Sequence, residues 1–169
     1  MNAISSRSYK SINWSAIVMF ALGFWLSASL VLDALIIPGL LRSGMMNESG
    51  FASAGYLIFG TFNHVELLCA GLVLAGCLVF RFAKNTSIKI TNELVFMAGM
   101  MLAIALTYTY VLTPQMSGMG LSLNQFETAS NSIDAMTIAH LSYWWLEIVK
   151  FVMGTVLLRA CYRNSCSLV

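Results

Sequence analysis

The chain has 169 residues, of which 59% are hydrophobic and only 9% charged, and its mean hydropathy is +0.79. Soluble domains carry about 25% charged residues, so nine Lys and Arg with seven Asp and Glu are too few to keep an 18.5 kDa globule in water. This composition excludes an ordinary soluble enzyme, a disordered chain, a disulfide-rich miniprotein and a basic nucleic-acid binder. It indicates a chain whose solvent is mostly lipid.

Four stretches of the chain are long and apolar enough to cross a bilayer as helices, which takes about 20 residues each. They are continuously apolar rather than alternating, so they do not predict barrel strands. We therefore expect an all-α integral membrane four-helix bundle, a single transmembrane domain over residues 1–169. The expected spans are residues 14–37, 56–82, 94–113 and 135–161, the first ending before Pro38 and the third at Pro114.

The basic residues predict the orientation of this bundle. Cytoplasmic loops of membrane proteins collect Lys and Arg, so both termini are expected on the cytoplasmic side or its equivalent. A four-span chain places seven basic residues on that side: Arg7, Lys10, Arg81, Lys84, Lys89, Arg159 and Arg163. On the opposite side it places Arg42 and the longest connection, Thr113 to Asp134, which is a candidate partner-binding surface or a linker.

Polar residues inside the predicted spans are the candidate functional groups, because each charge there costs a few kcal/mol. Glu66 is expected about 22 Å and Glu147 about 18 Å from the inner span ends, from a rise of 1.5 Å per residue. This places the polar groups in the outer half of the bundle. The intramembrane polar cluster comprises Asp33, Asn63, Glu66, Tyr108, Tyr143, Glu147 and Lys150.

Helical spacing predicts which of these groups share a face. His140, Tyr143, Trp144 and Glu147 lie three or four residues apart along one face of the fourth span, and Lys150 is within ion-pair reach of Glu147. In the second span, Asn63 and Glu66 share a side, whereas His64 is rotated by about 200° from Glu66.

These groups allow several functions. Glu147 with Lys150, and Glu66 with Asn63 or a tyrosine, could be hydrogen-bonded groups that fix helix register. Glu66 and Glu147 could instead form a path for a proton or an ion.

A cofactor site is a further hypothesis. His64 and His140 are the two histidines of the chain, and as candidate axial ligands on antiparallel helices they could hold a b-type haem. Copper would use thioether sulfur, with Met45-Met46 and the Met116/Met119 pair as candidates, although apolar filling also explains methionines.

Other motifs add little chemistry. The four cysteines include no C-x-x-C pair, and hydrolase, nucleotide-binding and zinc motifs are missing from the sequence. Small residues four apart, Gly71 with Ala75 and Gly99 with Ala103, could let the helices of the bundle approach closely, although small residues are common in membrane helices.

Three segments carry a resemblance to a known group. They are GFWLSASLVLDALIIP (Gly23–Pro38), FNHVELLCA (Phe62–Ala70) and HLSYWWLEIVK (His140–Lys150). In these segments and in its four-span layout the chain resembles small membrane proteins related to transmembrane protein 205, a group akin to CopD copper-resistance and HemJ-type protoporphyrinogen oxidase proteins. The likeness is to proteins of photosynthetic bacteria, which implies a plasma (inner) or thylakoid membrane. It implies no catalytic residue.

The small size of the chain favours a function that depends on contact with other membrane proteins. Four helices with short connections leave little room for a substrate cavity but expose a large side for helix docking. We therefore expect a non-enzymatic protein, an accessory or assembly subunit of a larger membrane complex, whose partners are lipids and other membrane subunits and not nucleic acid.

Overall fold

A computed structural model of the protein describes residues 13–44, 51–82, 91–123 and 130–166. Nearly all of these residues are helical, and no strand occurs among them. Four helical runs are long and apolar enough to cross a membrane: Trp14–Leu40, Ser53–Phe82, Asn92–Gly118 and Thr137–Arg163. The expected all-α architecture with four candidate spans is confirmed, and it supports a multi-pass membrane protein.

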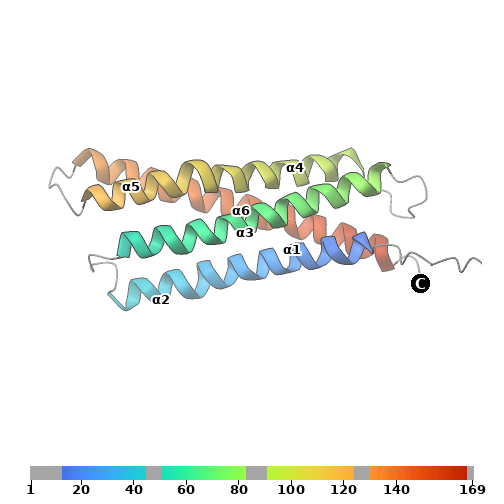
Figure 1. The fold of residues 1–169 in the computed structure, drawn as a ribbon, viewed down its shortest axis with the longest axis horizontal. Coiled ribbons are helices and arrows are strands. Elements are labelled where there is room, and N and C mark those ends of the chain that lie inside the picture. Colours follow the sequence, from blue (N-terminus) through green and yellow to red (C-terminus); the bar gives the residue numbers. More distant parts are fainter. Residues whose placement is uncertain (1–12, 45–50, 83–90, 124–129, 167–169) are drawn as a thin grey trace, which may run out of the picture.

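The spans are built from six α-helices and two π-helical turns. The α-helices are α1 (Trp14–Val31), α2 (Ile37–Arg42), α3 (Phe51–Phe82), α4 (Asn92–Thr107), α5 (Thr113–Leu123) and α6 (Ser130–Cys166). The π-helical turns are η1 (Leu32–Ile36), between α1 and α2, and η3 (Tyr108–Leu112), between α4 and α5. The first span is therefore α1–η1–α2 and the third is α4–η3–α5, each a continuous rod in Figure 1.

The four rods pack side by side with their long axes aligned (Figure 1). α1 contacts α3 and α6, and α4 contacts the same two helices. Within the described helices, α1 and α4 make no close backbone contact, and neither do α3 and α6, so these two pairs are diagonal. The start of α1 and the end of α6 lie at the same end of the bundle in Figure 1, as an even number of passes requires.

Both prolines of the chain lie inside helices, where the sequence predicts that helices end. Pro38 is the second residue of α2, and Pro114 is the second residue of α5. A helical proline lacks an N–H group, and its ring clashes with the carbonyl four residues earlier. In each case the wider π-helical turn directly before the proline takes up this mismatch, so the helix continues past it.

This continuation corrects the expected span boundaries on the side opposite the chain ends. The first span runs to Leu40 rather than residue 37, and the third to Gly118 rather than residue 113. Most of the expected outer connection is therefore helix, since α5 covers Thr113–Leu123 and α6 already begins at Ser130. Residues 124–129, between them, lie outside the described part of the chain.

Apolar side chains fill the half of the bundle that contains the chain ends. They come from α1, α3, α4 and α6 and include Val18, Leu22, Val73, Met101 and Leu157, all fully buried. Burial of such side chains stabilises by about 1.5–3 kcal/mol each in water, but lipid is as apolar as this core, so close packing carries the association here.

Two glycines allow the helices to approach closely, and they differ from the expected pair. A Cβ atom at Gly154 would lie 2.8 Å from a methyl carbon of Leu26, and one at Gly76 would overlap Val18. By contrast, a Cβ atom at Gly71 or Gly99 would meet open space. The predicted small-residue contacts within the bundle are therefore wrong at these two glycines, because their helix faces point away from the neighbouring spans.

The outer surface of the bundle is apolar. In the most apolar 18-residue stretch of each span, only 22% to 39% of the residues are buried within the bundle. Large exposed side chains include Phe20, Leu57, Leu68, Phe96 and Trp145. An apolar exterior of this extent is unfavourable in water and suits the hydrocarbon of a bilayer.

Candidate functional site

A set of buried polar side chains lies at the middle of the spans. Lys150 is the central residue of Thr137–Arg163, and Glu66 lies within two residues of the centre of Ser53–Phe82. Ser29 lies within two residues of the centre of the first span, and Tyr108 within three of the centre of the third. Asp33 and Tyr143 lie six and seven residues beyond the centres of their spans, toward the end opposite the chain ends. The polar groups therefore extend from the centre into the outer half, closer to the centre than expected because the spans extend further outward than the sequence predicts.

Lys150 is at the centre of this set. Its side chain is 1% exposed, and its Nζ lies 2.6 Å from Glu66 Oε1 and 2.7 Å from Glu147 Oε1. Nζ also donates a hydrogen bond to Ser29 Oγ at 3.0 Å. An ammonium group can donate three hydrogen bonds, and an unpaired one in hydrocarbon would be costly. The two ion pairs and the hydroxyl together account for its burial.

Glu66 is held by three donors on one oxygen. Its Oε1 accepts from Lys150 Nζ at 2.6 Å, from Trp25 Nε1 at 2.8 Å and from Ser29 Oγ at 3.0 Å. Trp25 and Ser29 lie on α1, one helical turn apart, so they present their donors from the same face. All three donors converge on one carboxylate oxygen, and together they satisfy this buried group.

Two tyrosines extend the network away from Lys150. Tyr108, the first residue of η3, donates from its hydroxyl to Glu147 Oε2 at 2.9 Å. The Tyr143 hydroxyl donates to Asp33 Oδ1 at 2.7 Å. The two tyrosine rings pack with their centroids 5.2 Å apart. Asp33 and Glu147 thus each have one carboxyl oxygen that accepts a hydrogen bond from a tyrosine hydroxyl.

The other oxygen of each carboxyl group lacks a hydrogen-bond donor. Asp33 Oδ2 and Glu147 Oε1 are buried and accept no hydrogen bond from the described residues. Glu147 Oε1 is an ion-pair partner of Lys150 at 2.7 Å, but the angle does not make a hydrogen bond. The Asp33 and Glu147 side chains are near enough for the charge of one to act on the other. A buried carboxylate oxygen without a hydrogen-bond donor is costly at this depth, and Asp33 Oδ2 also lacks an ion-pair partner among the described residues.

Both π-helical turns carry a member of the network. Asp33 lies in η1, and Tyr108 opens η3. A π-helical turn adds about one residue to the turn and so changes which side chains face the bundle interior. The prolines at 38 and 114 thus have a local consequence: the turns before them set the direction of Asp33 and of Tyr108.

Aromatic rings surround the ammonium group of Lys150. Its Nζ lies 5.4 Å from the ring centroid of Tyr108, 5.9 Å from that of Trp25 and 5.9 Å from that of Phe151. Ring faces attract cations, more strongly in a desolvated site. These rings therefore supplement the carboxylates and help to exclude lipid from the ion pairs.

The structure brings together six of the seven predicted cluster residues. Glu147 and Lys150 form the expected ion pair. Asn63 is buried, but its amide donates to Thr113 Oγ1 at 2.6 Å, so the expected Glu66–Asn63 contact is replaced by Lys150, Trp25 and Ser29. The six are Asp33, Glu66, Tyr108, Tyr143, Glu147 and Lys150, which with Trp25 and Ser29 we call the mid-membrane cluster.

Trp25 and Ser29 are the two members that sequence reasoning missed. Apolar composition gave no reason to single out a tryptophan or a serine in the first span. Their spacing of four residues on a single face, with Asp33 four residues further on, was the available signal.

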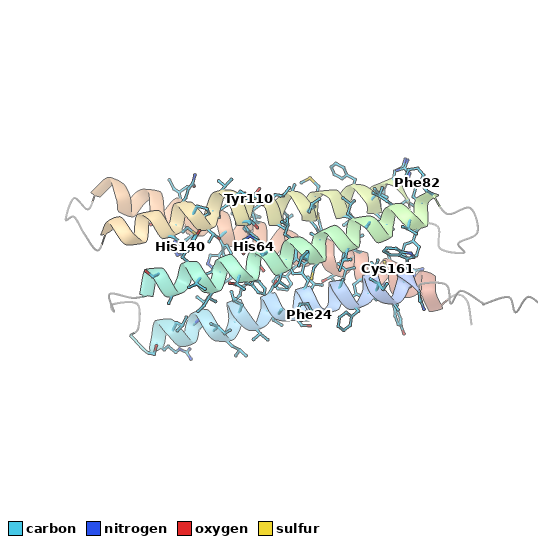
Figure 2. The ribbon with its side chains drawn as sticks, viewed as in Figure 1. Phe24, His64, Phe82, Tyr110, His140 and Cys161 are labelled. Carbon is cyan, nitrogen blue, oxygen red and sulfur yellow. The ribbon has the colours of Figure 1, made fainter. Side chains whose placement is uncertain are left out.

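The two histidines lie apart from the mid-membrane cluster. His64 is exposed, and its Nδ1 donates to the Gly60 carbonyl oxygen at 2.6 Å, whereas Glu66 on the same helix is 1% exposed. The predicted rotation between these two residues is thus confirmed. His140 is half-buried in α6, and both histidines lie in the half of the bundle that contains α5 (Figure 2).

The remaining candidates are only partly described. Met45 and Met46 lie outside the described residues, whereas Met116 is half-buried in α5. Among the described residues, His, Cys, Asp and Glu side chains form no group of three or more with metal-binding geometry. On α6, Tyr143 and Glu147 face the bundle, but Trp144 is exposed, so the expected common face is narrower than the spacing predicts.

Comparison with known proteins adds no functional argument. No family model matches the chain, and no similar curated protein or solved structure was found. Function is therefore argued from the mid-membrane cluster. Its carboxyl, hydroxyl and ammonium groups are linked by short contacts and can all accept or release protons.

Proposed function

We propose that the protein is a proton carrier of the membrane, which binds and releases protons at the mid-membrane cluster. The observation that carries this proposal is the position of Lys150 between Glu66 and Glu147 at the middle of four candidate spans. Ionisable groups buried at this depth are costly, and in membrane proteins they typically belong to proton or ion pathways.

The connectivity of the cluster supports a relay. Hydrogen bonds and ion pairs lead from Tyr108 to Glu147, Lys150 and Glu66, and a separate hydrogen bond joins Tyr143 to Asp33. The two tyrosines contact each other through their rings, which transfer no proton. Protons move along hydrogen-bonded groups, so each of these two parts of the cluster can hold and pass on a proton. The groups of the cluster come from all four spans, so a proton added at one group changes the charge balance felt by every helix.

The apolar core argues for a carrier rather than an open channel. Between the cluster and the end of the bundle that contains both chain ends, the buried residues are apolar, such as Val18, Leu22, Val73 and Leu157. A proton does not cross such a core without water or polar groups. Exchange with that side therefore requires the helices to rearrange.

Proton flux across vesicles tests the proposal. The protein is reconstituted in liposomes that contain a pH-sensitive dye, and a potassium diffusion potential drives proton movement. We expect wild-type flux above that of protein-free vesicles, and flux at the protein-free level for E66Q and E147Q. The matched control is E93Q, an exposed glutamate in the first turn of α4, which should retain wild-type flux. Wild-type vesicles no leakier than empty ones would contradict the proposal.

A second candidate function is the docking subunit expected from the sequence. It is favoured by the outward-facing glycines Gly71 and Gly99, which have open space where a neighbouring helix could approach. Purification in mild detergent with mass analysis of the native particle tests it. A complex that G71L disrupts would support docking, and recovery of the protein only as a monomer would contradict it.

Orientation and membrane are part of the same proposal. Arg81 lies in the last turn of α3, and Arg159 and Arg163 lie in the last part of α6, near the chain ends, whereas Arg42 ends α2 at the opposite end. We infer from this bias that the end with both termini faces the cytoplasm. The resemblance to proteins of photosynthetic bacteria favours a plasma or thylakoid membrane.

A further inference from the structure

The carboxyl groups of Asp33 and Glu147 form a pair with an unusual pattern of partners. On the outward oxygens, Asp33 Oδ1 accepts from Tyr143 and Glu147 Oε2 accepts from Tyr108. The remaining oxygens, Asp33 Oδ2 and Glu147 Oε1, are both buried and accept no hydrogen bond from the described residues. The two residues are 7% and 2% exposed, so neither oxygen is compensated by bulk water.

The charges around this pair do not balance if every carboxyl group is ionised. Asp33, Glu66 and Glu147 are three buried carboxyl groups, and Lys150 is the one ammonium group that contacts them among the described residues. Lys150 forms its shortest contact with Glu66, which also has Trp25 and Ser29 as donors. Glu66 is therefore the group best stabilised as an anion, and the charge excess falls on Asp33 and Glu147.

We propose that Asp33 and Glu147 bind one proton between them, held by Asp33 Oδ2 and Glu147 Oε1, and that this pair is the proton-binding site of the protein. The proton satisfies both oxygens: one oxygen carries it as an O–H group, and the oxygen of the other carboxyl group accepts the hydrogen bond. Two carboxyl groups that share a site cannot both ionise cheaply, and a single proton then belongs to the pair.

The surrounding groups fit this assignment. Tyr143 and Tyr108 donate to the outward oxygens and hold both carboxyl groups in place, while Lys150 stabilises the remaining negative charge of the pair. The thiol of Cys69, also on α3, lies near Glu66. In this arrangement Glu66 and Lys150 are a fixed ion pair, and the proton that moves is the one shared by Asp33 and Glu147.

The position of the site also assigns a role to the π-helical turn η1. Asp33 lies within η1, the π-helical turn before Pro38, so a rearrangement of this turn toward an α-helix would part Asp33 from Glu147 on α6. Separation leaves two carboxylates that no longer share a proton, and the proton is released. Uptake is the reverse: the proton binds when the two carboxyl groups meet.

Infrared spectroscopy tests the site without a transport assay, although its role as the carrier site rests on the proposed function. A protonated carboxyl group gives a carbonyl stretching band that a carboxylate lacks, and deuterium oxide shifts it. We expect this band at neutral pH in the wild type and in E66Q, its loss in D33N, and a frequency shift in Y143F. In D33N the remaining Glu147 faces Lys150 and is ionised.

The outcomes separate the site from the function. A band that disappears in E66Q and persists in D33N would overturn the shared proton, as would its absence from the wild type. If D33N fails to fold, Y143F decides, because a band unaffected by loss of the Tyr143 hydrogen bond does not arise from Asp33 and overturns the site. The expected band without wild-type flux would support the site and contradict the carrier. Wild-type flux without the infrared band would support the carrier and contradict the shared-proton site.

Discussion

Nζ of Lys150 on α6 lies 2.6 Å from Oε1 of Glu66 on α3, although these two helices are diagonal and their backbones make no close contact within the described bundle. The long lysine side chain therefore crosses the centre of the bundle. At the same level, Trp25 and Ser29 reach Glu66 from α1, and the Tyr108 ring from η3 lies 5.4 Å from Nζ. One ammonium group thus ties all four spans together.

This central position predicts the effect of removing the ammonium group. K150M leaves Glu66 and Glu147 buried without a cation, and breaking a buried pair typically costs about 3–5 kcal/mol. We expect that loss in the free energy of unfolding, measured by denaturant titration in detergent micelles. The double variant K150M/E66Q should be more stable than K150M alone, since it removes one of the stranded charges. A cost for K150M below about 1 kcal/mol would contradict the central role.

The close helix approaches predict a difference between two glycines on α3. G76A places a Cβ atom against the stiff, β-branched side chain of Val18, and overpacking of this kind costs about 1–3 kcal/mol. The matched control is G71A, whose Cβ atom meets open space, so its stability should equal or slightly exceed that of the wild type. Thermal unfolding of both variants in the same detergent makes the comparison. Equal losses of thermal stability in G76A and G71A would contradict the predicted difference between the two faces of α3.

The π-helical turn before Pro114 predicts an energetic coupling between this proline and Tyr108. P114A restores the N–H group and removes the ring clash that the turn accommodates, so η3 should relax toward an α-helix and turn Tyr108 away from Glu147. P114A should therefore cost less stability in a Y108F background than in the wild type. The difference should be about 1 kcal/mol, the usual net contribution of an intramolecular hydrogen bond. Strict additivity would disprove the coupling.

The proposed orientation predicts which residues reach the cytoplasmic compartment. Single cysteines at positions 13 and 163, in a background without the native cysteines, should both be labelled by an impermeant maleimide from the cytoplasmic face of oriented membrane vesicles. A cysteine at position 43, in the exposed segment after α2, should be labelled only from the opposite face. Labelling of positions 13 and 163 from different faces would exclude an even number of passes.

Residue types and hydropathy were sufficient to predict much of the site. Charged residues in apolar runs are conspicuous, so Asp33, Glu66, Glu147 and Lys150 were identified as buried before any packing was known, and all four are at most 7% exposed. The i, i+3 spacing also predicted the Glu147–Lys150 ion pair, because this contact is local to one helix.

Contacts between helices were less predictable. Asn63 was placed beside Glu66 by their spacing, yet it bonds to Thr113 on the third span. The expected span ends at Pro38 and Pro114 were also wrong, since a π-helical turn lets each helix continue. Because the spans are longer than expected, Glu66 and Lys150 lie near their centres, whereas Asp33 and Tyr143 remain in the outer half. A regular period of 100° per residue cannot anticipate a turn that adds a residue.

The sequence by itself determined that four apolar helices form, that charged side chains are buried among them, and that both chain ends belong at the same end, because these properties depend on composition and on local period. Only the tertiary structure decided that Lys150 pairs across the diagonal with Glu66 and that Trp25 and Ser29 complete that pair. These contacts depend on the relative height and rotation of separate helices, which close packing and two π-helical turns set together.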